Sequence, residues 1–457
     1  MAAKTIILGA GPAGLAAVET MRELDGGESS LTLISAEPPY ARMILPYFLA
    51  GDIPEEQLYL GSDEYFATLG VETIFGQRVT SLQPAEKKVL LDDGTAVEFD
   101  QLLLALGSTA QPLDLPGADL RGVVNLWTLD DAHRALVGAP EEAEVVFIGA
   151  GFIGLVVLTA LAKRGWKLNL VEIAPQVLPR MLDQPAARLV EKWLKQRGVA
   201  VFTQTTVTEI GLRADGRKNV RLSDGRDLTA DLVIMAAGVR PNLGAVEGSG
   251  LQTEWGILIN DRCQTNFPYI YAAGDVAQGP DLLTGEPTVH PVHPTAVEQG
   301  RVAGANLAGQ EVHYPGSLRM NILNVLNLYG ASFGQWEDDG REVQVLSNEA
   351  RPLYRKLVWD ADRLVGAIFL GPAEDVTMLT DLGMVKGLIQ TQTELGVWKE
   401  YLQKNPLDLR RPYVACQVAR RLLEQSLLGR PATPRRYRYR NLQPWSRPAP
   451  VQQLLLG

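Results

Sequence analysis

The sequence has little cysteine, little histidine and no excess of positive charge. Its 457 residues include two cysteines, Cys263 and Cys416, and four histidines. The cysteines form no CxxC pair and no metal-ligand spacing, which excludes a disulfide framework and a built-in iron–sulfur centre, so no metal site is expected. So few cysteines suit a reducing cytoplasm. A formal net charge of -10 argues against non-specific nucleic-acid binding by the body of the protein.

One apolar run is long enough to suggest a membrane span. Residues 145–162, VVFIGAGFIGLVVLTALA, carry no charge over eighteen positions. Three spaced glycines interrupt this run, so we expect a strand, a turn and a buried helix there, and no transmembrane segment. Lys4 is the only charged residue before the first apolar run, so no cleavable signal is expected.

The remaining composition is typical of a globular protein. Hydrophobic residues make up 46% and charged residues 21% of the sequence, close to the averages for folded domains. At ~150 residues per domain, the length predicts about three domains.

A strand, a glycine-rich turn and a helix open the chain. Residues 4–17 read KTIILGAGPAGLAA, with the helical pattern starting at Leu15. Gly9 permits the tight turn, Gly11 has no Cβ to block a pyrophosphate, and Gly14 lets helix and strand pack closely. The helix N-terminus offers N–H groups to phosphates. A dinucleotide site is therefore favoured over a structural turn.

The acid that binds a ribose in such folds follows the glycines by about twenty residues, after the second strand. The pattern predicts that strand at residues 31–34, and Glu37 follows it. We assign Glu37 to the ribose; a solvated loop acid is the alternative.

A second copy of this pattern begins at residue 145. Gly149, Gly151 and Gly154 repeat the spacing, and a strand at residues 167–171 ends at Glu172. An acid there suits the ribose hydroxyls of NADH, and no Arg or Lys follows at once to hold the 2′-phosphate of NADPH. NADH is therefore preferred to NADPH.

Each copy is followed by a predicted meander and an apolar strand that ends in glycine. These strands are residues 102–106, before Gly107, and residues 232–235, before Gly238. A third signature, IYAAGDV at residues 270–276, delivers Gly274 and Asp275 to a turn, where the carboxylate can bind a sugar-like hydroxyl or cap the next helix. A small-residue helix is predicted at residues 294–309.

These motifs, in this order, resemble the FAD-dependent pyridine nucleotide-disulfide oxidoreductases, which include NADH oxidases, coenzyme A-disulfide reductases, and rubredoxin, ferredoxin and nitrite reductases. The matching segments are GAGPAG at 9, LLALGS at 103, GAGFIG at 149, MAAGVRPN at 235, IYAAGDV at 270 and EQGRVAGANLAG at 298. Residues 355–371 resemble the family's C-terminal domain, which is used for dimer contact.

The resemblance implies an α/β protein with two Rossmann-like dinucleotide-binding domains, the FAD domain interrupted by the NAD domain, and an α+β C-terminal interface domain. The expected segments are an FAD-binding domain in two parts (1–115 and 244–315), an NAD(P)H-binding domain (116–243), an interface domain (316–411), and a helix with an Arg/Pro-rich tail (412–457).

The resemblance also implies that Asp275 contacts the ribityl–phosphate part of FAD and that Arg42 lies near the flavin phosphates; a surface cation beside Glu37 is the alternative for Arg42. The predicted cofactor-binding residues are Gly9, Gly11, Pro12, Ala13, Gly14, Glu37, Arg42, Ala105, Gly107, Gly149, Gly151, Phe152, Ile153, Gly154, Glu172, Gly238, Gly274 and Asp275.

The chain differs from the family at the positions expected to lie near the flavin. Met43 stands where the disulfide-reducing branches carry a cysteine against the flavin, and a thioether forms no thiolate and no mixed disulfide. Disulfide reduction through that position is excluded, and no side chain is expected to act as acid, base or nucleophile. Tyr47 and Val156 match the positions of a lysine and a glutamate that pair near the flavin in electron-transferring branches. Tyr47 either lies against the flavin, blocks it, or is a core aromatic.

Two further features leave alternatives open. His290 and His293 are expected near the flavin end of the site, or as loop histidines with ordinary hydrogen bonds. Residues 429–457 carry six arginines among aromatic residues and prolines. A strap that docks on a partner subunit or a dimer mate is preferred there, over a solvated tail or a site for RNA or anionic lipid.

The sequence therefore predicts an FAD-dependent NAD(P)H oxidoreductase that passes electrons from NADH through the flavin to a separate acceptor, a protein carrier or a partner subunit, in a homodimer or a larger complex. The alternative is a flavin-bearing, non-catalytic assembly subunit with a degenerate nicotinamide site.

Overall fold

The first glycine motif builds a parallel sheet that is completed by a strand from much later in the chain. The computed structural model describes residues 3–426 and residue 428. All neighbouring strands in this sheet run parallel. The strand order is β19 (Ile270–Ala272), β7 (Gln101–Leu104), β1 (Lys4–Leu8), β2 (Ser30–Ser35) and β3 (Val71–Phe75).

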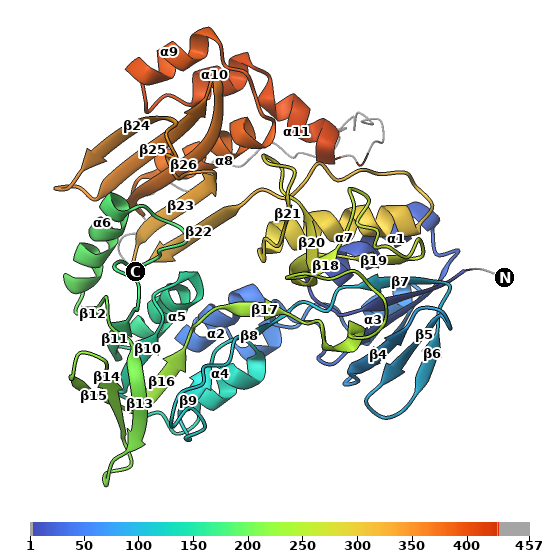
Figure 1. The fold of residues 1–457 in the computed structure, drawn as a ribbon, viewed down its shortest axis with the longest axis horizontal. Coiled ribbons are helices and arrows are strands. Elements are labelled where there is room, and N and C mark those ends of the chain that lie inside the picture. The colour runs from blue at the N-terminus through green and yellow to red at the C-terminus, as the bar shows by residue number, and fades with distance from the viewer. Residues whose placement is uncertain (1–2, 427, 429–457) are drawn as a thin grey trace, which may run out of the picture.

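Two helices rich in small residues pack side by side on this sheet (Figure 1). They are α1 (Pro12–Asp25) and α7 (His293–Leu307). A Cβ on Gly300 would lie 2.2 Å from the Ala13 carbonyl oxygen, and one on Gly304 would lie 2.7 Å from that of Ala17. Helix α1 begins three residues before the predicted Leu15, because Gly11 is its N-cap and Pro12 suits the first helical turn.

Short elements complete the first unit around this sheet. They are η1 (Arg42–Ile44), α2 (Leu45–Ala50), η2 (Glu55–Gln57), α3 (Asp63–Thr68), the meander β4 (Val79–Gln83), β5 (Lys88–Leu91) and β6 (Ala96–Glu98), then η3 (Gly244–Val246), β18 (Ile257–Leu258), η4 (Gly274–Val276), β20 (Ala277–Pro280) and β21 (Pro287–Thr288).

The second glycine motif builds a second parallel sheet inserted within the first unit. Its order is β12 (Ala200–Phe202), β11 (Lys167–Val171), β10 (Glu144–Ile148), β16 (Leu232–Met235) and β9 (Val123–Asn125). Its other elements are α4 (Leu129–Leu136), α5 (Phe152–Ala162), α6 (Gln184–Lys195) and the meander β13 (Val207–Leu212), β14 (Lys218–Leu222) and β15 (Asp227–Ala230). A two-stranded ribbon of β8 (Ser108–Ala110) and β17 (Val239–Pro241) joins the two units.

An antiparallel sheet follows at the C-terminal end. Its order is β22 (Met320–Val325), β23 (Leu328–Gly334), β26 (Arg363–Pro372), β25 (Leu353–Asp360) and β24 (Glu342–Asn348). Helix α8 (Val376–Gln390) packs against β26, and part of the sheet shares a hydrophobic core with the second unit. The Tyr354 hydroxyl donates to Asp183, at the start of α6, over 2.7 Å. The predicted α/β class with a C-terminal domain is confirmed.

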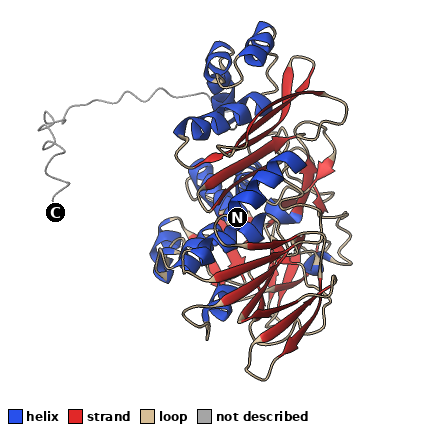
Figure 2. Cartoon of the chain, turned by 90° about the vertical axis from the view of Figure 1, so that its left-hand side faces the viewer, coloured by secondary structure: helices blue, strands red, loops and turns tan. Residues whose placement is uncertain are grey.

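Three short helices cap this end of the molecule, opposite the meanders (Figures 1 and 2). They are α9 (Val397–Lys404), α10 (Arg410–Ala415) and α11 (Val418–Ser426). The single helix expected at the start of 412–457 is instead two helices, because Gln417 adopts a left-handed backbone (φ +52°) that ends α10 before α11 begins. The arginine-rich segment 429–457 lies outside the described residues.

The apolar run at 145–162 forms β10, the glycine turn and α5, as predicted. Within the described part of the chain, every helix is too short or too polar to cross a bilayer.

Candidate functional site

Both glycine loops open into one large cavity. Its volume is about 3090 Å³, and its walls include the two loops, η1 and α2, the β8–β17 ribbon, the segment after β9 and strand β22. Dinucleotides bound at the two loops would therefore share one space, which hydride transfer between them requires.

The first loop leaves an opening at its middle glycine. A Cβ on Gly9 would lie 2.2 Å from the Ala105 carbonyl oxygen, and one on Gly14 would lie 1.9 Å from the carbonyl oxygen of Gly9. No described atom lies within 4 Å of a Cβ built on Gly11, which lines the cavity. The outer glycines allow close packing, and the middle one leaves room for a pyrophosphate at the N-terminus of α1. The first loop therefore has the shape needed to hold the pyrophosphate of FAD.

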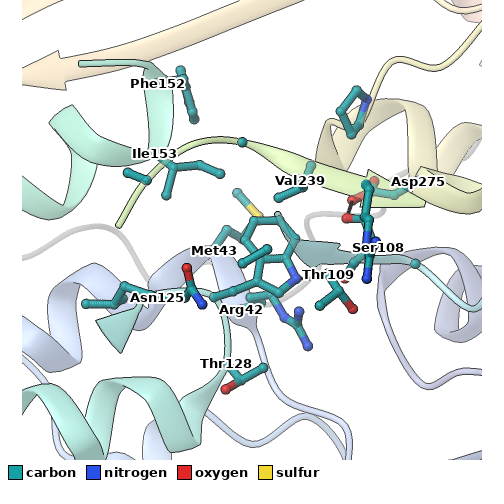
Figure 3. Close-up of a pocket in the computed structure, with 18 of the residues that line it drawn as sticks. Arg42, Met43, Ser108, Thr109, Asn125, Thr128, Phe152, Ile153, Val239 and Asp275 are labelled. Carbon is teal, nitrogen blue, oxygen red and sulfur yellow. Dashed lines mark hydrogen bonds between the residues drawn. The ribbon is translucent and has the colours of Figure 1, made fainter. Parts of the chain in front are cut away.

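The second loop repeats this geometry. A Cβ on Gly149 would lie 2.5 Å from the Ala236 carbonyl oxygen, and one on Gly154 would lie 2.5 Å from that of Gly149. The position of Gly151 is again open, with no described atom within 4 Å. Phe152 and Ile153 follow on the cavity wall (Figure 3).

The two predicted ribose acids lie in different places. Glu172 is 7% exposed and accepts backbone hydrogen bonds from Ala150 (2.7 Å) and Ala174 (2.8 Å). It directly follows β11, whereas Ser35 ends β2 and Glu37 lies two residues further on. Glu172 therefore supports its own glycine loop, and Glu37 does not.

Glu37 forms an ion pair with Arg42 instead. The Arg42 guanidinium donates to Glu37 over 2.8 Å. It also lies near two aromatic rings, 5.5 Å from the centre of Tyr40 and 5.3 Å from that of Trp127. All four residues line the cavity. The position beside Glu37 that was the alternative for Arg42 is present, and Arg42 also lines the cavity (Figure 3).

Asp275 lies at the end of β19, within η4. Its carboxylate accepts a hydrogen bond from the Ser108 hydroxyl over 2.6 Å, and it does not cap α7, which starts at His293 (Figure 3). Burial raises the pKa of Asp275, while the Ser108 hydrogen bond and the Arg42 charge oppose this shift. Gly274 has a φ of +79° and donates its N–H to Gln299 over 2.8 Å, which fixes the turn.

Met43 and Tyr47 present their side chains to the cavity. Met43 is 58% exposed and Tyr47 is 52% exposed, so Tyr47 is not a core aromatic. The Lys163 ammonium lies 5.8 Å from the centre of the Tyr47 ring. Val156 lines the same cavity from α5, which packs against α2. Tyr47 and Val156 thus place no charged pair at these two positions, and Lys163 is the cation nearest to them on this wall.

Neither cysteine lines the cavity, among the residues that the structure describes. Cys263 is fully buried, and burial raises the pKa of its thiol well above the usual value. Cys416 caps the end of α10 and packs against the hydrophobic cluster of the C-terminal sheet and α8. No described cysteine can serve as a redox relay here.

The remaining predicted residues also lie on the cavity wall. Ala105, Gly107 and Gly238 follow β7 and β16. His290 shares a 2.8 Å hydrogen bond with Ser317, as the loop-histidine alternative expected, and burial lowers the pKa of both His290 and His293. The described chain contains no group of three His, Cys, Asp or Glu side chains that could hold a metal.

Several residues of the cavity wall carry little or no sequence signal. Ser108 was visible only as the last letter of LLALGS, and Trp127 lies in a short connection without a motif. The buried side-chain oxygens of Asn125 and Gln77 have no hydrogen-bond partner in the described chain, and both residues line the cavity. Orphaned polar atoms on a cavity wall fit a polar ligand.

Two known protein families match this chain over most of its length. The sequence profile of the pyridine nucleotide-disulphide oxidoreductases matches residues 3–300, and that of the rubredoxin NAD+ reductase C-terminal domain matches residues 320–383. The chain belongs to the pyridine nucleotide-disulphide oxidoreductase family. The predicted oxidoreductase class and its cofactors, FAD and NAD(P)H, are confirmed with this family.

Subunit epsilon of the NADH-dependent phenylglyoxylate dehydrogenase of Aromatoleum evansii is 30% identical over 413 residues, which are 89% of this chain and 96% of that protein. The electron transfer subunit of the assimilatory nitrate reductase of Bacillus subtilis is 28% identical over 83% of this chain. The chain spans about half of that subunit, 49% of its length. Among solved structures, a chain of the covalent putidaredoxin reductase–putidaredoxin complex matches with a TM-score of 0.80 and 26% identity, over 91% of this chain and 99% of that one.

Proposed function

We propose that this chain takes electrons from NADH on bound FAD and passes them to a separate redox protein or partner subunit, without cysteine chemistry. One observation carries the proposal. Both glycine loops face a single cavity in which the exposed Met43, and no described cysteine, occupies the wall beside α2.

The protein's part is to bind and orient the cofactors. The first loop, with Pro12 and Ala13 at the start of α1, would hold the FAD pyrophosphate, and Asp275 would accept a hydrogen bond from the ribityl chain. The second loop would hold the nicotinamide dinucleotide. When bound, FAD supplies the hydride acceptor and releases electrons to a second partner. No side chain needs to donate or accept a proton.

NADH is the proposed donor because of Glu172. Its buried carboxylate lies beside the second loop, and the next residues, Ile173 and Ala174, carry no positive charge. The 2′-phosphate of NADPH would meet this carboxylate, and no cation directly follows it in the chain.

The relatives support a protein acceptor. Two are named as subunits, one of them an electron transfer subunit, and one solved relative is joined to putidaredoxin. We extend this to the chain as a whole, with the segment boundaries given above and with the C-terminal sheet and helices as a contact surface for a dimer mate or a larger complex. The few cysteines support a cytoplasmic setting.

A second candidate function is a flavin-bearing assembly subunit with a degenerate nicotinamide site. Tyr47 favours it, because its half-exposed ring occupies the wall where a nicotinamide would have to approach the flavin.

Two mixing steps under anaerobic conditions separate these functions. NADH is expected to bleach the flavin band near ~450 nm. A second mix with an oxidised small iron–sulfur protein should restore the band, whereas coenzyme A disulfide should not. Restoration by the disulfide alone would contradict the proposed acceptor class, and no bleaching by either NADH or NADPH would favour the assembly subunit.

A further inference from the structure

A short segment between β11 and α6 connects the second glycine loop to the C-terminal sheet. Residues 178–181 of this segment line the cavity, as Glu172 does at its start. The Leu178 N–H donates to the carbonyl oxygen of Ala150, inside the glycine loop, over 2.9 Å. The segment ends at Asp183, whose carboxylate caps α6. One end of this stretch of wall is therefore held by the loop, and the other end depends on Asp183.

The C-terminal sheet holds Asp183 from the side opposite the loop. A single oxygen of its carboxylate accepts hydrogen bonds from the Tyr354 hydroxyl over 2.7 Å and from the Lys356 ammonium over 3.2 Å. Both donors belong to β25 and are nearly inaccessible to water, with 2% and 6% of their surface exposed. A buried ion pair is strongly destabilised when one partner is removed. The position of Asp183 therefore depends on both β25 side chains.

Other contacts bind the same segment to the C-terminal sheet. Arg319, directly before β22, donates to the carbonyl oxygen of Arg180 over 3.1 Å and to Glu337 over 2.8 Å. Leu178 and Met181 are buried in the core that the second unit shares with this sheet. Helix α6 lies beside the sheet (Figure 1). The wall at 178–181 is thus packed between its glycine loop and the C-terminal sheet.

The residue between Tyr354 and Lys356 provides a comparison on the same strand. Successive side chains of a strand point to opposite faces. Arg355 accordingly pairs with Asp381 of α8, over 2.5 Å, and both side chains of this pair are buried. One face of β25 therefore binds the second unit, and the other face binds α8.

We propose that Tyr354 and Lys356 are positioning residues for the nicotinamide dinucleotide. By fixing Asp183 they hold residues 178–181 against the second glycine loop, so the C-terminal sheet contributes to the affinity for the dinucleotide without contacting it through these side chains. Without them the segment can shift, and a displaced wall binds less tightly. This inference rests on dinucleotide binding at the second loop and is independent of the electron acceptor.

Calorimetric titration of the oxidised, FAD-loaded chain with NAD+ tests the inference, because NAD+ binds without reducing the flavin. Lys356→Met should raise the Kd about fivefold and Tyr354→Phe about threefold, with the FAD content unchanged. Lys356→Arg keeps a charged donor and should bring the Kd back to within about twofold of wild type. Arg355→Met is the matched control, since it breaks an equally buried ion pair on the other face of the strand, and its Kd should equal that of wild type.

Hydrogen–deuterium exchange distinguishes positioning from a general loss of stability. The backbone N–H groups of residues 178–183 should exchange faster in Lys356→Met than in Arg355→Met. If Lys356→Met does not fold, Tyr354→Phe decides the matter. Equal increases in Kd for the Lys356 and Arg355 variants would overturn the proposal, and so would a wild-type Kd in both Lys356→Met and Tyr354→Phe. The expected Kd changes in a chain whose flavin NADH does not reduce would support this inference and contradict the proposed function.

Discussion

The two dinucleotide units have nearly the same loop and different acids. In each, the outer glycines press against backbone carbonyls and the middle glycine faces open space. In the second unit Glu172 directly follows the strand and accepts a hydrogen bond from the loop, at the Ala150 N–H, whereas in the first unit Glu37 is further along and is paired with Arg42. The phosphate end of such a site is thus set by local backbone geometry. The sugar end depends on contacts that each unit makes separately.

The middle glycines give the largest expected effect. Gly11→Val should weaken FAD binding by about 10- to 100-fold, because the side chain would enter the space left for the pyrophosphate. Gly151→Val should leave FAD bound and abolish most reduction by NADH. Flavin content and anaerobic bleaching measure the two losses separately. Gly211→Val, at an open glycine on β13 outside the cavity, is the control. Equal FAD loss in the Gly11 and Gly151 variants would remove the distinction between the units.

The acids come next. Glu172→Ala removes a carboxylate that accepts one hydrogen bond from the loop, at Ala150, and one from Ala174. It should raise the KM for NADH by about tenfold, with FAD retained and the preference over NADPH reduced. Glu37→Ala should weaken only FAD binding, and by less than about tenfold, because Glu37 makes no hydrogen bond to its own glycine loop, all of which the structure describes. Steady-state kinetics with both nucleotides check this; an unchanged NADH preference in Glu172→Ala would assign nucleotide choice to another residue.

Asp275, the third acid, should make the stability of the apoprotein depend on pH. Burial raises the pKa of Asp275 above its ordinary value of 3.8. Its protonated form therefore favours the folded apoprotein at low pH, and that contribution is lost as the pH rises through the raised pKa. Asp275→Asn stays neutral, so the Tm of the variant should rise relative to that of wild type as the pH rises above 3.8. For a chain of this length the relative rise should be about 1 °C for each kcal/mol involved. Thermal unfolding of both apoproteins across this range measures the gain; parallel curves would mean that Asp275 titrates normally.

Met43 should show the smallest effect. Met43→Ala removes a half-exposed thioether that has no role in proton or electron transfer, so bleaching by NADH should slow by less than about threefold. Stopped-flow absorbance measures the rate. A loss of a hundredfold would give the thioether a role that its chemistry does not provide.

The glycine loops were predictable because a strand, a turn and a helix of adjacent residues determine them. The same holds for α7, whose glycines allow it to approach α1. The contacts between distant segments were not predictable: Ser108 and Asp275 are 167 residues apart in the chain, and no local pattern marks their meeting. Trp127 lies in no recognisable motif, because its contacts with Ser108 and Arg42 arise only when the second unit packs against the first. The break at Gln417 was missed because the apolar pattern continues across it, although the backbone there turns left-handed.

Anaerobic titration of the FAD-loaded chain with NADH is the most direct test of electron transfer within the shared cavity. Loss of the flavin absorbance near ~450 nm at about one NADH per FAD is expected, together with no such loss in Gly151→Val. An oxidised flavin in the presence of both NADH and NADPH, when dithionite reduces it fully, would contradict the proposal that the two glycine loops bring NADH and FAD together.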